Sequence, residues 1–479
     1  MPKQFFYAQI FDSILKYLSV RSFFTLGTMA CTLIFMRVLG PYQYGKLSLV
    51  LHVAIMSGLL LSFGFSGTLA KFIPAETERD SKATLASAAL GVSGLAFATA
   101  FVIFAALLAW RPKLIPVEIR SVPVAFVVYI LGFTLFNVMQ GIFRGGGLFL
   151  KWSFIEGLQD VVGKIVAVGA IFILGKSFDA AFYPLAFCLT IFVAYCAWEL
   201  RPYWQVPPLR LEPAFVRYAL TVFLGQILFI LATSMDPLLL RTLLKDPTQV
   251  GYYFAGIRIP KTLESFLIAP LSVPLLYYFS HPDGLWARGK IVAHGTRLLG
   301  MASGLLSLVL IAAAEAIVHL LFGDSYAASV SVLRIYSLIL FFVGTQSVMN
   351  SYYYAVNKPE VPIGIGIFTI IALPLLDWLL IPHWKSAGAA LATVLSLFLA
   401  TCLFVVLLPK DEVSVVGDGL KLMVALGLSL AVGYGISYYL APVIFCILIT
   451  VFKLLRRNDF SRIQELLRQR RQTNDARLA

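Results

Sequence analysis

Long hydrophobic runs dominate the chain, and charged residues, prolines or glycines interrupt them at roughly regular intervals. About fourteen runs have a length of roughly 17 to 28 residues, which is what a transmembrane helix needs. They lie at 19–39, 46–70, 84–110, 122–142, 153–175, 179–200, 215–240, 251–279, 293–321, 327–356, 360–381, 386–408, 419–436 and 438–455. The pattern predicts an all-α polytopic membrane protein with about 14 transmembrane helices. Only Gly435 and Ser437 separate the last two runs, so a single long helix there, giving about 13 spans, is the alternative.

The composition agrees with a membrane protein and excludes two other classes. Hydrophobic residues make up 59% of the 479 residues, and charged residues make up 13%. A soluble domain has about a quarter charged residues, and a disordered chain has low hydrophobicity, so neither class fits. The five cysteines lie inside hydrophobic runs, which argues against disulfides and against a metal centre. They are Cys31, Cys188, Cys196, Cys402 and Cys446.

The formal net charge is +14, and the basic residues are distributed unevenly over the predicted loops. With the N-terminus in the cytoplasm, roughly 25 Lys and Arg residues fall on the inner side and roughly nine on the outer side. The basic tail from Lys453 to Arg477 belongs to the inner set, which favours an even number of spans. We therefore predict a multi-pass protein of the cytoplasmic (inner) membrane with both termini in the cytoplasm. Because the cations are spread over many loops, nucleic acid is not an expected partner.

Both ends of the chain carry amphipathic segments. The apolar residues at 5–15 face Lys3 and Lys16, and those at 460–467 face the arginines of the C-terminal tail. A basic amphipathic helix of this kind is typical of a membrane surface. We expect each segment to lie on the inner leaflet without crossing the bilayer.

A weak internal repeat runs through the chain with an offset of about 206 to 210 residues. Residues 37–45 (RVLGPYQYG) correspond to residues 241–251 (RTLLKDPTQVG). An even number of predicted spans separates the copies, so the repeats are parallel and related by an axis along the membrane normal. We expect two pseudo-symmetric six-helix lobes, an N-lobe at 1–205 and a C-lobe at 206–410. Two C-terminal helices and a basic cytoplasmic tail follow at 411–479.

The loop RVLGPYQYGKLSL, which begins at Arg37, resembles the first loop of a transporter family. The polysaccharide (O-antigen type) flippases of the multidrug/oligosaccharidyl-lipid/polysaccharide (MOP) exporter superfamily typically read Arg-x-Leu-Gly-Pro-x-x-Tyr-Gly there. Further matches follow in order at 62–66 (SFGFS), 236–240 (DPLLL), 251–255 (GYYFA), 322–327 (FGDSYA) and 388–393 (GAALAT). The resemblance covers most of spans 1 to 12 and fades in the last two. It implies a fourteen-helix exporter that moves a lipid-linked sugar across the membrane and is not an enzyme.

Ionisable residues at membrane depth are the candidate site, because each costs about 3 kcal/mol to insert. The cationic candidates for binding a substrate diphosphate are Lys164, Arg258, Lys261 and Arg334, to which we add His52. Arginine suits this role because its planar fork binds phosphate oxygens in pairs. The acidic candidates for ion coupling or helix pairing are Asp160, Asp236, Glu264 and Asp377. We expect no cofactor, and the choice of coupling ion, H+ or Na+, stays open.

Internal pairing is the alternative for these charges. Asp160 with Lys164, and Lys261 with Glu264, have the spacing of neighbours on one helix face, and such pairs would hold helices together without touching a substrate. Arg334 has the further alternative of extending to the outer face of the membrane.

Three prolines in the eighth predicted span favour a bend there, because a proline removes a backbone hydrogen bond. Pro260, Pro270 and Pro274 make this span a candidate hinge for alternating access, with a static kink as the alternative. Asp236 precedes Pro237, which leaves a backbone carbonyl without its helical hydrogen bond, so that an ion could bind there. Helix capping and stabilisation of a kink are the simpler roles for Asp236. His52 has a packing role as its simpler alternative.

The sequence therefore predicts a flippase that moves a polyprenyl diphosphate-linked oligosaccharide from the inner to the outer leaflet through a basic central cavity. Expected partners are this lipid-linked oligosaccharide, membrane lipids, and a glycan polymerase or glycosyltransferases. The alternatives are a peptidoglycan-precursor flippase or a cation-coupled drug exporter of the same superfamily, and then a membrane glycan polymerase or ligase. An exporter of organic cations needs an acidic cavity, whereas basic residues predominate here. A polymerase or ligase needs a large outer loop, whereas the predicted outer loops are short.

Overall fold

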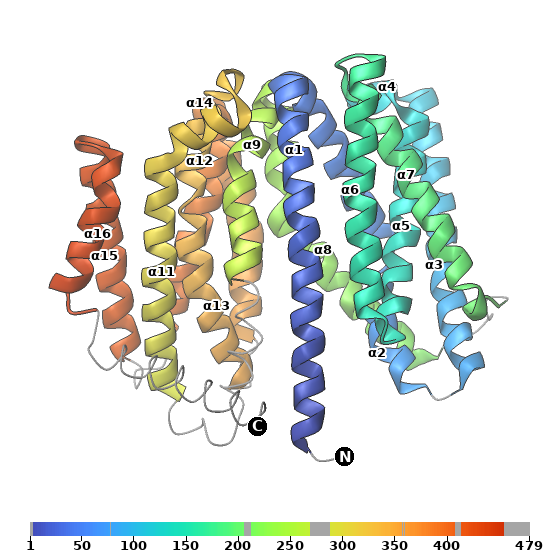
Figure 1. Ribbon diagram of the computed structural model, residues 1–479, viewed down its shortest axis with the longest axis horizontal. Coiled ribbons are helices and arrows are strands. Elements are labelled where there is room, and N and C mark those ends of the chain that lie inside the picture. Colours follow the sequence, from blue (N-terminus) through green and yellow to red (C-terminus); the bar gives the residue numbers. More distant parts are fainter. Residues whose placement is uncertain are drawn as a thin grey trace, which may run out of the picture. The chain divides into compact units, whose positions relative to one another are not determined.

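The computed structural model describes residues 3–76, 78–205, 212–268, 288–356, 358, 360–407 and 413–454. These residues form helices joined by short turns, and no strand occurs among them (Figure 1). The first helices are α1 (Lys3–Leu61), α2 (Phe65–Phe72), α3 (Arg79–Trp110), α4 (Val117–Ser121), α5 (Pro123–Gly145), α6 (Phe149–Leu174), α7 (Phe178–Glu199), α8 (Pro213–Leu244) and α9 (Pro247–Leu263). The later helices are α11 (Arg288–Ile317), α12 (Ser329–Tyr336), α13 (Ile339–Ala355), α14 (Glu360–Val406), α15 (Val413–Gly435) and α16 (Ala441–Val451).

The helices have the length and composition of membrane-spanning segments. Among the described residues, nine helices are long and apolar enough to cross a membrane. Each of the predicted hydrophobic runs overlaps a helix. In a bilayer core every backbone polar group needs an internal partner, which is why such runs fold as helices. The prediction of an all-α polytopic membrane protein is confirmed, and the number of about 14 crossings stays a prediction.

Two of the nine helices contain a sharp break, so that each carries two of the expected spans. The breaks lie at Gly40 in α1, with φ 69° and ψ 172°, and at Lys385 in α14, with φ 52° and ψ −130°. Glycine adopts a positive φ without a steric penalty, and the following Pro41 cannot donate a backbone hydrogen bond to continue the turn before it. The predicted boundary between the runs at 19–39 and 46–70 is therefore confirmed.

The N-terminal amphipathic segment is helical. α1 continues from Lys3 to the break at Gly40, with no separate helix for the segment at 5–15. A helix that has formed adds one hydrogen bond for each further residue, so the amphipathic stretch is continuous with the helix of the first span, which begins at Ser22. Its place on the inner leaflet stays a prediction. The second amphipathic segment, at 460–467, lies outside the described residues.

Packing divides the chain into two compact units. Unit 1 consists of Met1–Ala255, Val318–Ser329 and Ile370–Ala389, and unit 2 consists of Gly256–Ile317, Val330–Thr369 and Ala390–Ala479. In unit 1, α1 packs against α5, α6 and α7, and α2 contacts both α5 and α8. In unit 2, α11 packs against α13, α15 and α16 around a core that includes Leu308, Phe341, Leu422 and Phe445. These packing units are not the lobes expected at 1–205 and 206–410, because the lobes were defined by the sequence repeat. The lobes stay a prediction.

The two copies of the repeated loop meet within unit 1 in a reciprocal contact. A Cβ atom on Gly45 would overlap the carbonyl oxygen of Pro247, and one on Gly251 would overlap the carbonyl oxygen of Pro41. The partners in both contacts are related by the same offset of about 206 residues, which is the arrangement expected of pseudo-symmetric copies. Glycine is needed at both positions because the backbones approach too closely for any side chain.

Replacing Gly45 by alanine should separate these loops and lower the free energy of unfolding by about 1 to 3 kcal/mol, as overpacking does. A thermal unfolding series on the purified protein in detergent measures the change. Gly94 is the matched control, because it lies inside α3 and a Cβ there would meet no atom within 4 Å. Gly94→Ala should be neutral or stabilising by about 0.5 to 1 kcal/mol. Equal effects of the two changes would contradict the close approach at Gly45.

Candidate functional site: buried polar residues at membrane depth

Lys164 lies in a polar cluster between α1 and α6. Its ammonium group is 2.8 Å from Asp160 Oδ1, one helical turn earlier on α6. The same carboxylate accepts a hydrogen bond of 2.6 Å from the Thr28 hydroxyl on α1. Asp160 therefore joins α1 to α6 and also fixes the position of the Lys164 ammonium. The geometry agrees with internal pairing of Asp160 and Lys164, which was the alternative to substrate binding. The paired Lys164 still carries its positive charge within a predicted span.

His52 and Ser234 connect the second half of α1 to α8. The His52 Nε2 atom lies 3.1 Å from the Ser234 carbonyl oxygen, and its ring is 5.6 Å from that of Phe254 on α9. Ser234 lies three residues before Pro237, which is inside α8. A proline within a helix opens the backbone ladder around it, so a carbonyl in that turn accepts a bond from elsewhere. His52 thus links α1 to the proline-containing turn of α8.

Asp236, Tyr253 and Asp377 form a buried acidic cluster in unit 1. The Tyr253 hydroxyl on α9 donates a hydrogen bond of 2.5 Å to Asp236 Oδ2 on α8. Asp377 on α14 lies beside Asp236, close enough for the two carboxyl groups to hydrogen-bond. All three side chains are buried, and Asp377 is completely inaccessible. Two carboxyl groups at this separation cannot both be ionised unless a cation or a proton lies between them. The cluster can therefore hold one positive charge.

A second group of predicted residues lies along α9 and the π-helical turn that follows it, η4 (Glu264–Ile268). Arg258 is half-buried, and Lys261 acts electrostatically on Glu264 one turn later. Pro260 lies inside α9 four residues before the π-helical turn. π-Helical turns and prolines are both recognised causes of a helix bend. The structure thus places one of the three hinge prolines next to a π-helical turn, while Pro270 and Pro274 lie outside the described residues.

Arg334 is held by two neighbours in unit 2. Its NH2 atom is 3.3 Å from Glu315 Oε2 on α11, and its guanidinium carbon lies 4.2 Å from the centre of the Tyr438 ring. An ion pair and a cation–π contact together fix an arginine in one orientation. The geometry favours a structural role for Arg334 over contact with a substrate.

The structure brings some of the predicted residues together and assigns others to the second unit. His52, Asp236 and Asp377 share one region of unit 1, because Ser234 and Asp236 are two residues apart on α8. Asp160 and Lys164 form their own pair in the same unit. The remaining four, Arg258, Lys261, Glu264 and Arg334, belong to unit 2. No group of three or more His, Cys, Asp or Glu side chains that could hold a metal ion occurs in the described part of the chain.

A comparison with known protein families shows to which family the chain belongs. Residues 17–280 match the family described as polysaccharide biosynthesis protein, which is more than half of the chain. The chain belongs to this family. The resemblance of its first loop to the polysaccharide flippases is therefore confirmed by a match that runs from the first span into the eighth.

Solved structures show the same fold. The lipid II flippase MurJ in an inward closed conformation has a TM-score of 0.70 at 11% identity, over 92% of this chain and 99% of that chain. A multidrug resistance MATE family transporter of the MOP superfamily, inward-facing, has a TM-score of 0.65 at 16% identity, over 86% of this chain and 98% of that chain. At these identities the likeness establishes the fold and no more. No curated protein matches the chain by sequence.

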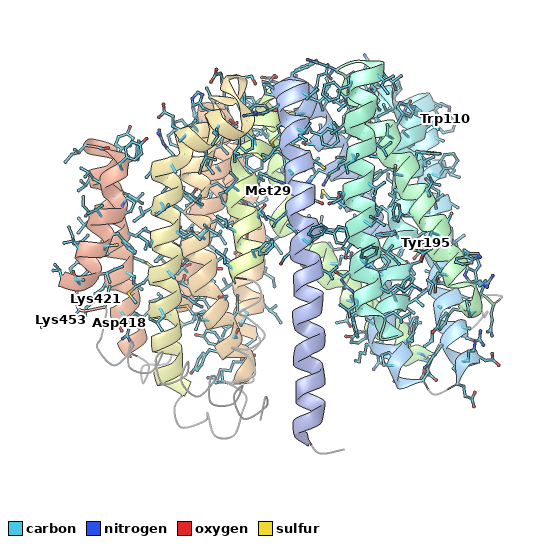
Figure 2. The ribbon with its side chains drawn as sticks, in the orientation of Figure 1. Met29, Trp110, Tyr195, Asp418, Lys421 and Lys453 are labelled. Carbon is cyan, nitrogen blue, oxygen red and sulfur yellow. The ribbon has the colours of Figure 1, made fainter. Side chains whose placement is uncertain are left out.

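Two ion pairs of this polysaccharide biosynthesis protein were not singled out from its sequence. In unit 1, Glu118 on the short helix α4 is buried and accepts bonds of 3.1 Å and 2.7 Å from Arg241 at the end of α8. In unit 2, the fully buried Arg297 on α11 lies 3.3 Å from Asp418 on α15, which is labelled in Figure 2. Each of the four residues lies near the end of a hydrophobic run, where a charge is usually assigned to a loop. Because of this position, the sequence pattern does not mark these four residues as buried charges.

All five cysteines of this family member are free thiols in the structure. Three of them, Cys31, Cys188 and Cys196, are buried among the helices of unit 1. A small apolar packing residue is the role that this environment gives them.

Proposed function

We propose that this protein moves a polyprenyl diphosphate-linked oligosaccharide from the inner to the outer leaflet of the cytoplasmic membrane. Membership of the polysaccharide biosynthesis family carries the proposal. The fold it shares with a lipid II flippase and a MOP superfamily transporter supports a transport function. In this proposal both termini lie in the cytoplasm, and the chain makes and breaks no covalent bond. A glycan polymerase or glycosyltransferases would act before or after it on the same oligosaccharide.

The physical task is to carry a diphosphate through hydrocarbon. Burying an uncompensated charge costs tens of kcal/mol in the Born limit, whereas the polyprenyl tail crosses no unfavourable region. The carrier therefore has to enclose the headgroup in a basic cavity while the tail stays in lipid. Lys164, Arg258 and Lys261 are the cations that we assign to the diphosphate. Arg334 takes no part, because Glu315 and Tyr438 already hold it.

Alternating access requires a helix that bends, and α9 with η4 is our candidate. Pro260 and the π-helical turn at Glu264–Ile268 weaken the regular hydrogen-bond ladder in adjacent turns. The membrane potential assists the cycle, since each charge gains about 2.3 kcal/mol per 100 mV. With the cytoplasm negative, an anionic headgroup is driven outward and an empty basic cavity is drawn back.

The acidic cluster is our candidate for the coupling site, with a proton as the coupling ion. Tyr253 donates to Asp236, and Asp377 lies beside it, so one proton shared by the two carboxyl groups would neutralise one of their charges. The cluster joins α8, α9 and α14, so a change in its charge would alter the contact between three helices. Asp160 is assigned to helix pairing instead, because it already binds both Thr28 and Lys164.

Complementation of a strain that lacks its own oligosaccharide flippase tests the proposal. Wild-type protein should restore surface glycan, and the double variant Lys164→Gln/Arg258→Gln should restore less than about a tenth of it, since two cations that bind phosphate are lost. Protein abundance in the membrane is measured in parallel. A strain that lacks its peptidoglycan-precursor flippase serves as the second recipient, and rescue of that strain alone would assign the alternative cargo.

The matched control removes the same charge elsewhere. Lys113 and Lys176 are both exposed, and both lie in loops that the charge pattern assigns to the outer side. Lys113→Gln/Lys176→Gln should restore surface glycan to the wild-type level. Full rescue by the Lys164→Gln/Arg258→Gln protein would remove these cations from the transport path.

A further inference from the structure

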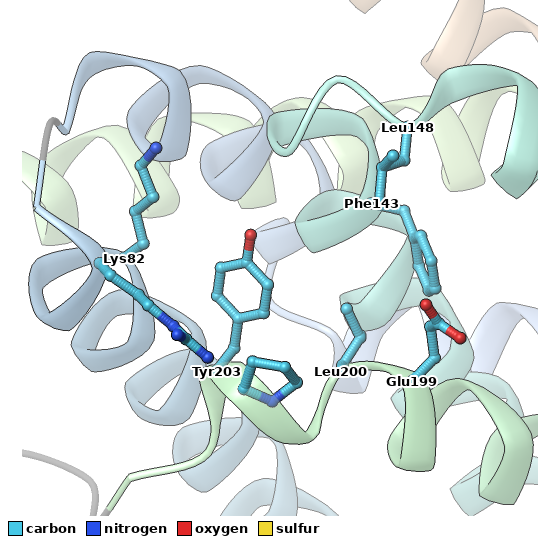
Figure 3. A pocket seen from close by; sticks show the side chains of 8 residues that line it. Lys82, Phe143, Leu148, Glu199, Leu200 and Tyr203 are labelled. Carbon is cyan, nitrogen blue, oxygen red and sulfur yellow. The ribbon is translucent and has the colours of Figure 1, made fainter.

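A pocket of about 390 Å³ opens at one end of the unit 1 helices, away from the polar clusters already described. It lies where α3 begins, where α5 turns into α6, and where α7 ends in the short helix η3 (Arg201–Tyr203). Figure 3 shows Lys82 on one side and Glu199 and Leu200 on the other, with the Tyr203 ring between them. Its volume is within the range that small ligands occupy.

The wall formed by η3 is fixed to α3 by side chains. The Ser87 hydroxyl donates a 3.2 Å bond to the Tyr203 carbonyl and accepts a 2.9 Å bond from the Gln205 backbone N–H. The Gln205 side chain donates to Asp80 and accepts from Thr84 on the same helix. On the α5–α6 side, a Cβ on Gly146 would lie 3.8 Å from the Tyr203 hydroxyl. These contacts hold the walls of the pocket in fixed positions.

The lining combines two cations with an apolar surface. Arg79 and Lys82 are three residues apart on α3 and so lie on one face of that helix. Glu199 also lines the pocket, but Lys151 neutralises it through an ion pair of 2.5 Å. The remaining lining residues are Phe143, Leu148, Leu200, Pro202 and Tyr203. The net charge of the site is positive, and a group that combines an anion with aliphatic carbon fits it best.

The residues around the pocket are typical of a membrane–water interface. Trp198 and Trp204, which flank it in sequence, are 58% and 55% exposed, and the Arg201 guanidinium lies 5.2 Å from the centre of the Trp198 ring. Exposed tryptophans beside cations mark the headgroup region of a bilayer. Arg79, Lys82 and Lys151 all belong to the residues that the charge pattern assigns to the cytoplasmic side, where anionic lipids gather.

We propose that this pocket binds the phosphate headgroup of an anionic phospholipid from the surrounding leaflet. Arg79 and Lys82 bind the phosphate, Tyr203 donates to one of its oxygens, and Leu148 and Pro202 contact the glycerol and the start of the acyl chains. Headgroup recognition by basic pockets between membrane helices follows from the charge of the lipid and the apolar character of its tail. The bound lipid would stabilise the end of α7 against α3 whatever cargo the protein carries.

Native mass spectrometry of the full-length protein tests the proposal. The protein is reconstituted in nanodiscs of phosphatidylcholine with a minority of phosphatidylglycerol, and the lipids that remain bound after release are counted. Wild-type protein should retain phosphatidylglycerol selectively. Each cation near an anionic surface contributes about fivefold in affinity, so Arg79→Gln/Lys82→Gln should weaken retention roughly 25-fold. The charge-preserving variant Arg79→Lys/Lys82→Arg should retain the lipid.

A matched control and a second variant decide the interpretation. Arg217→Gln/Lys358→Gln removes two exposed cations outside the pocket and should retain phosphatidylglycerol as the wild type does. Leu148→Glu places a negative charge at an exposed position of the lining and should weaken retention while both cations remain. Equal losses in the pocket and control variants, or no selective retention by the wild type, would overturn the site.

A competition experiment with inorganic phosphate distinguishes a site for a phospholipid headgroup from a site for free phosphate. At constant ionic strength, added sodium phosphate should leave the bound phosphatidylglycerol in place, because the apolar half of the pocket contributes to lipid binding and cannot hold a free ion. Displacement of the lipid by millimolar phosphate would show a free-phosphate site and overturn the lipid assignment.

Discussion

Replacing Asp377 by asparagine should lower the proton-driven transport rate about tenfold to fiftyfold while the protein still folds and inserts. Asparagine has the shape of aspartate and still hydrogen-bonds Asp236, but it cannot release a proton. One elementary charge moving through 100 mV is worth about 2.3 kcal/mol, which corresponds to the upper end of this loss. The initial rate of transfer of a lipid-linked saccharide in vesicles, with and without an imposed proton gradient, measures it.

We expect a smaller loss of transport rate when Tyr253, the hydrogen-bond donor of the acidic cluster, is replaced. Tyr253→Phe removes the 2.5 Å bond to Asp236 but leaves both carboxyl groups, so the rate should fall less than in Asp377→Asn and should still respond to the gradient. Glu360→Gln is the matched control, because it removes an exposed carboxylate from the first turn of the same helix, α14. It should transport at the wild-type rate. An Asp377→Asn protein that keeps the full response to the gradient would contradict proton coupling at this cluster.

The helices of this protein could be predicted because the bilayer leaves the backbone few choices. A run such as 84–110 has to satisfy its own hydrogen bonds, and it folds as α3. The break at Gly40–Pro41 could also be predicted, since a positive φ and a proline act locally. The same holds for Asp160 and Lys164, whose pairing depends only on four residues of helix.

The parts of the site that depend on tertiary packing could not be predicted. Asp236 and Asp377 are far apart in sequence, and only the tertiary fold brings their carboxyl groups together. Tyr253 gave no signal, because a tyrosine in a hydrophobic run is usually an apolar packing residue with one polar end. Arg334 is a substrate candidate by its residue type and its depth in a predicted span, and the sequence does not reveal Glu315 and Tyr438, on two other helical segments, which hold it in place.

Replacing Arg297 by methionine should lower the free energy of unfolding by about 3 to 5 kcal/mol. The Arg297 side chain is fully buried, and its partner Asp418 is nearly so, so the single change leaves a carboxylate in a low-dielectric interior without its cation. Because the pair joins α11 to α15, we expect the two C-terminal spans to separate first on heating. Thermal and denaturant unfolding in detergent, followed by size-exclusion chromatography, measures the change.

The double variant Arg297→Met/Asp418→Leu shows whether the loss comes from the unpaired charge. Removing both partners of a buried ion pair is often neutral, so this protein should recover most of the stability that the single variant loses. Arg217→Met, at an exposed cation of α8, should change the free energy of unfolding by less than about 0.5 kcal/mol. If the double variant were as unstable as Arg297→Met alone, the arginine would stabilise unit 2 through its aliphatic packing, and the charge of Asp418 would have no part in it.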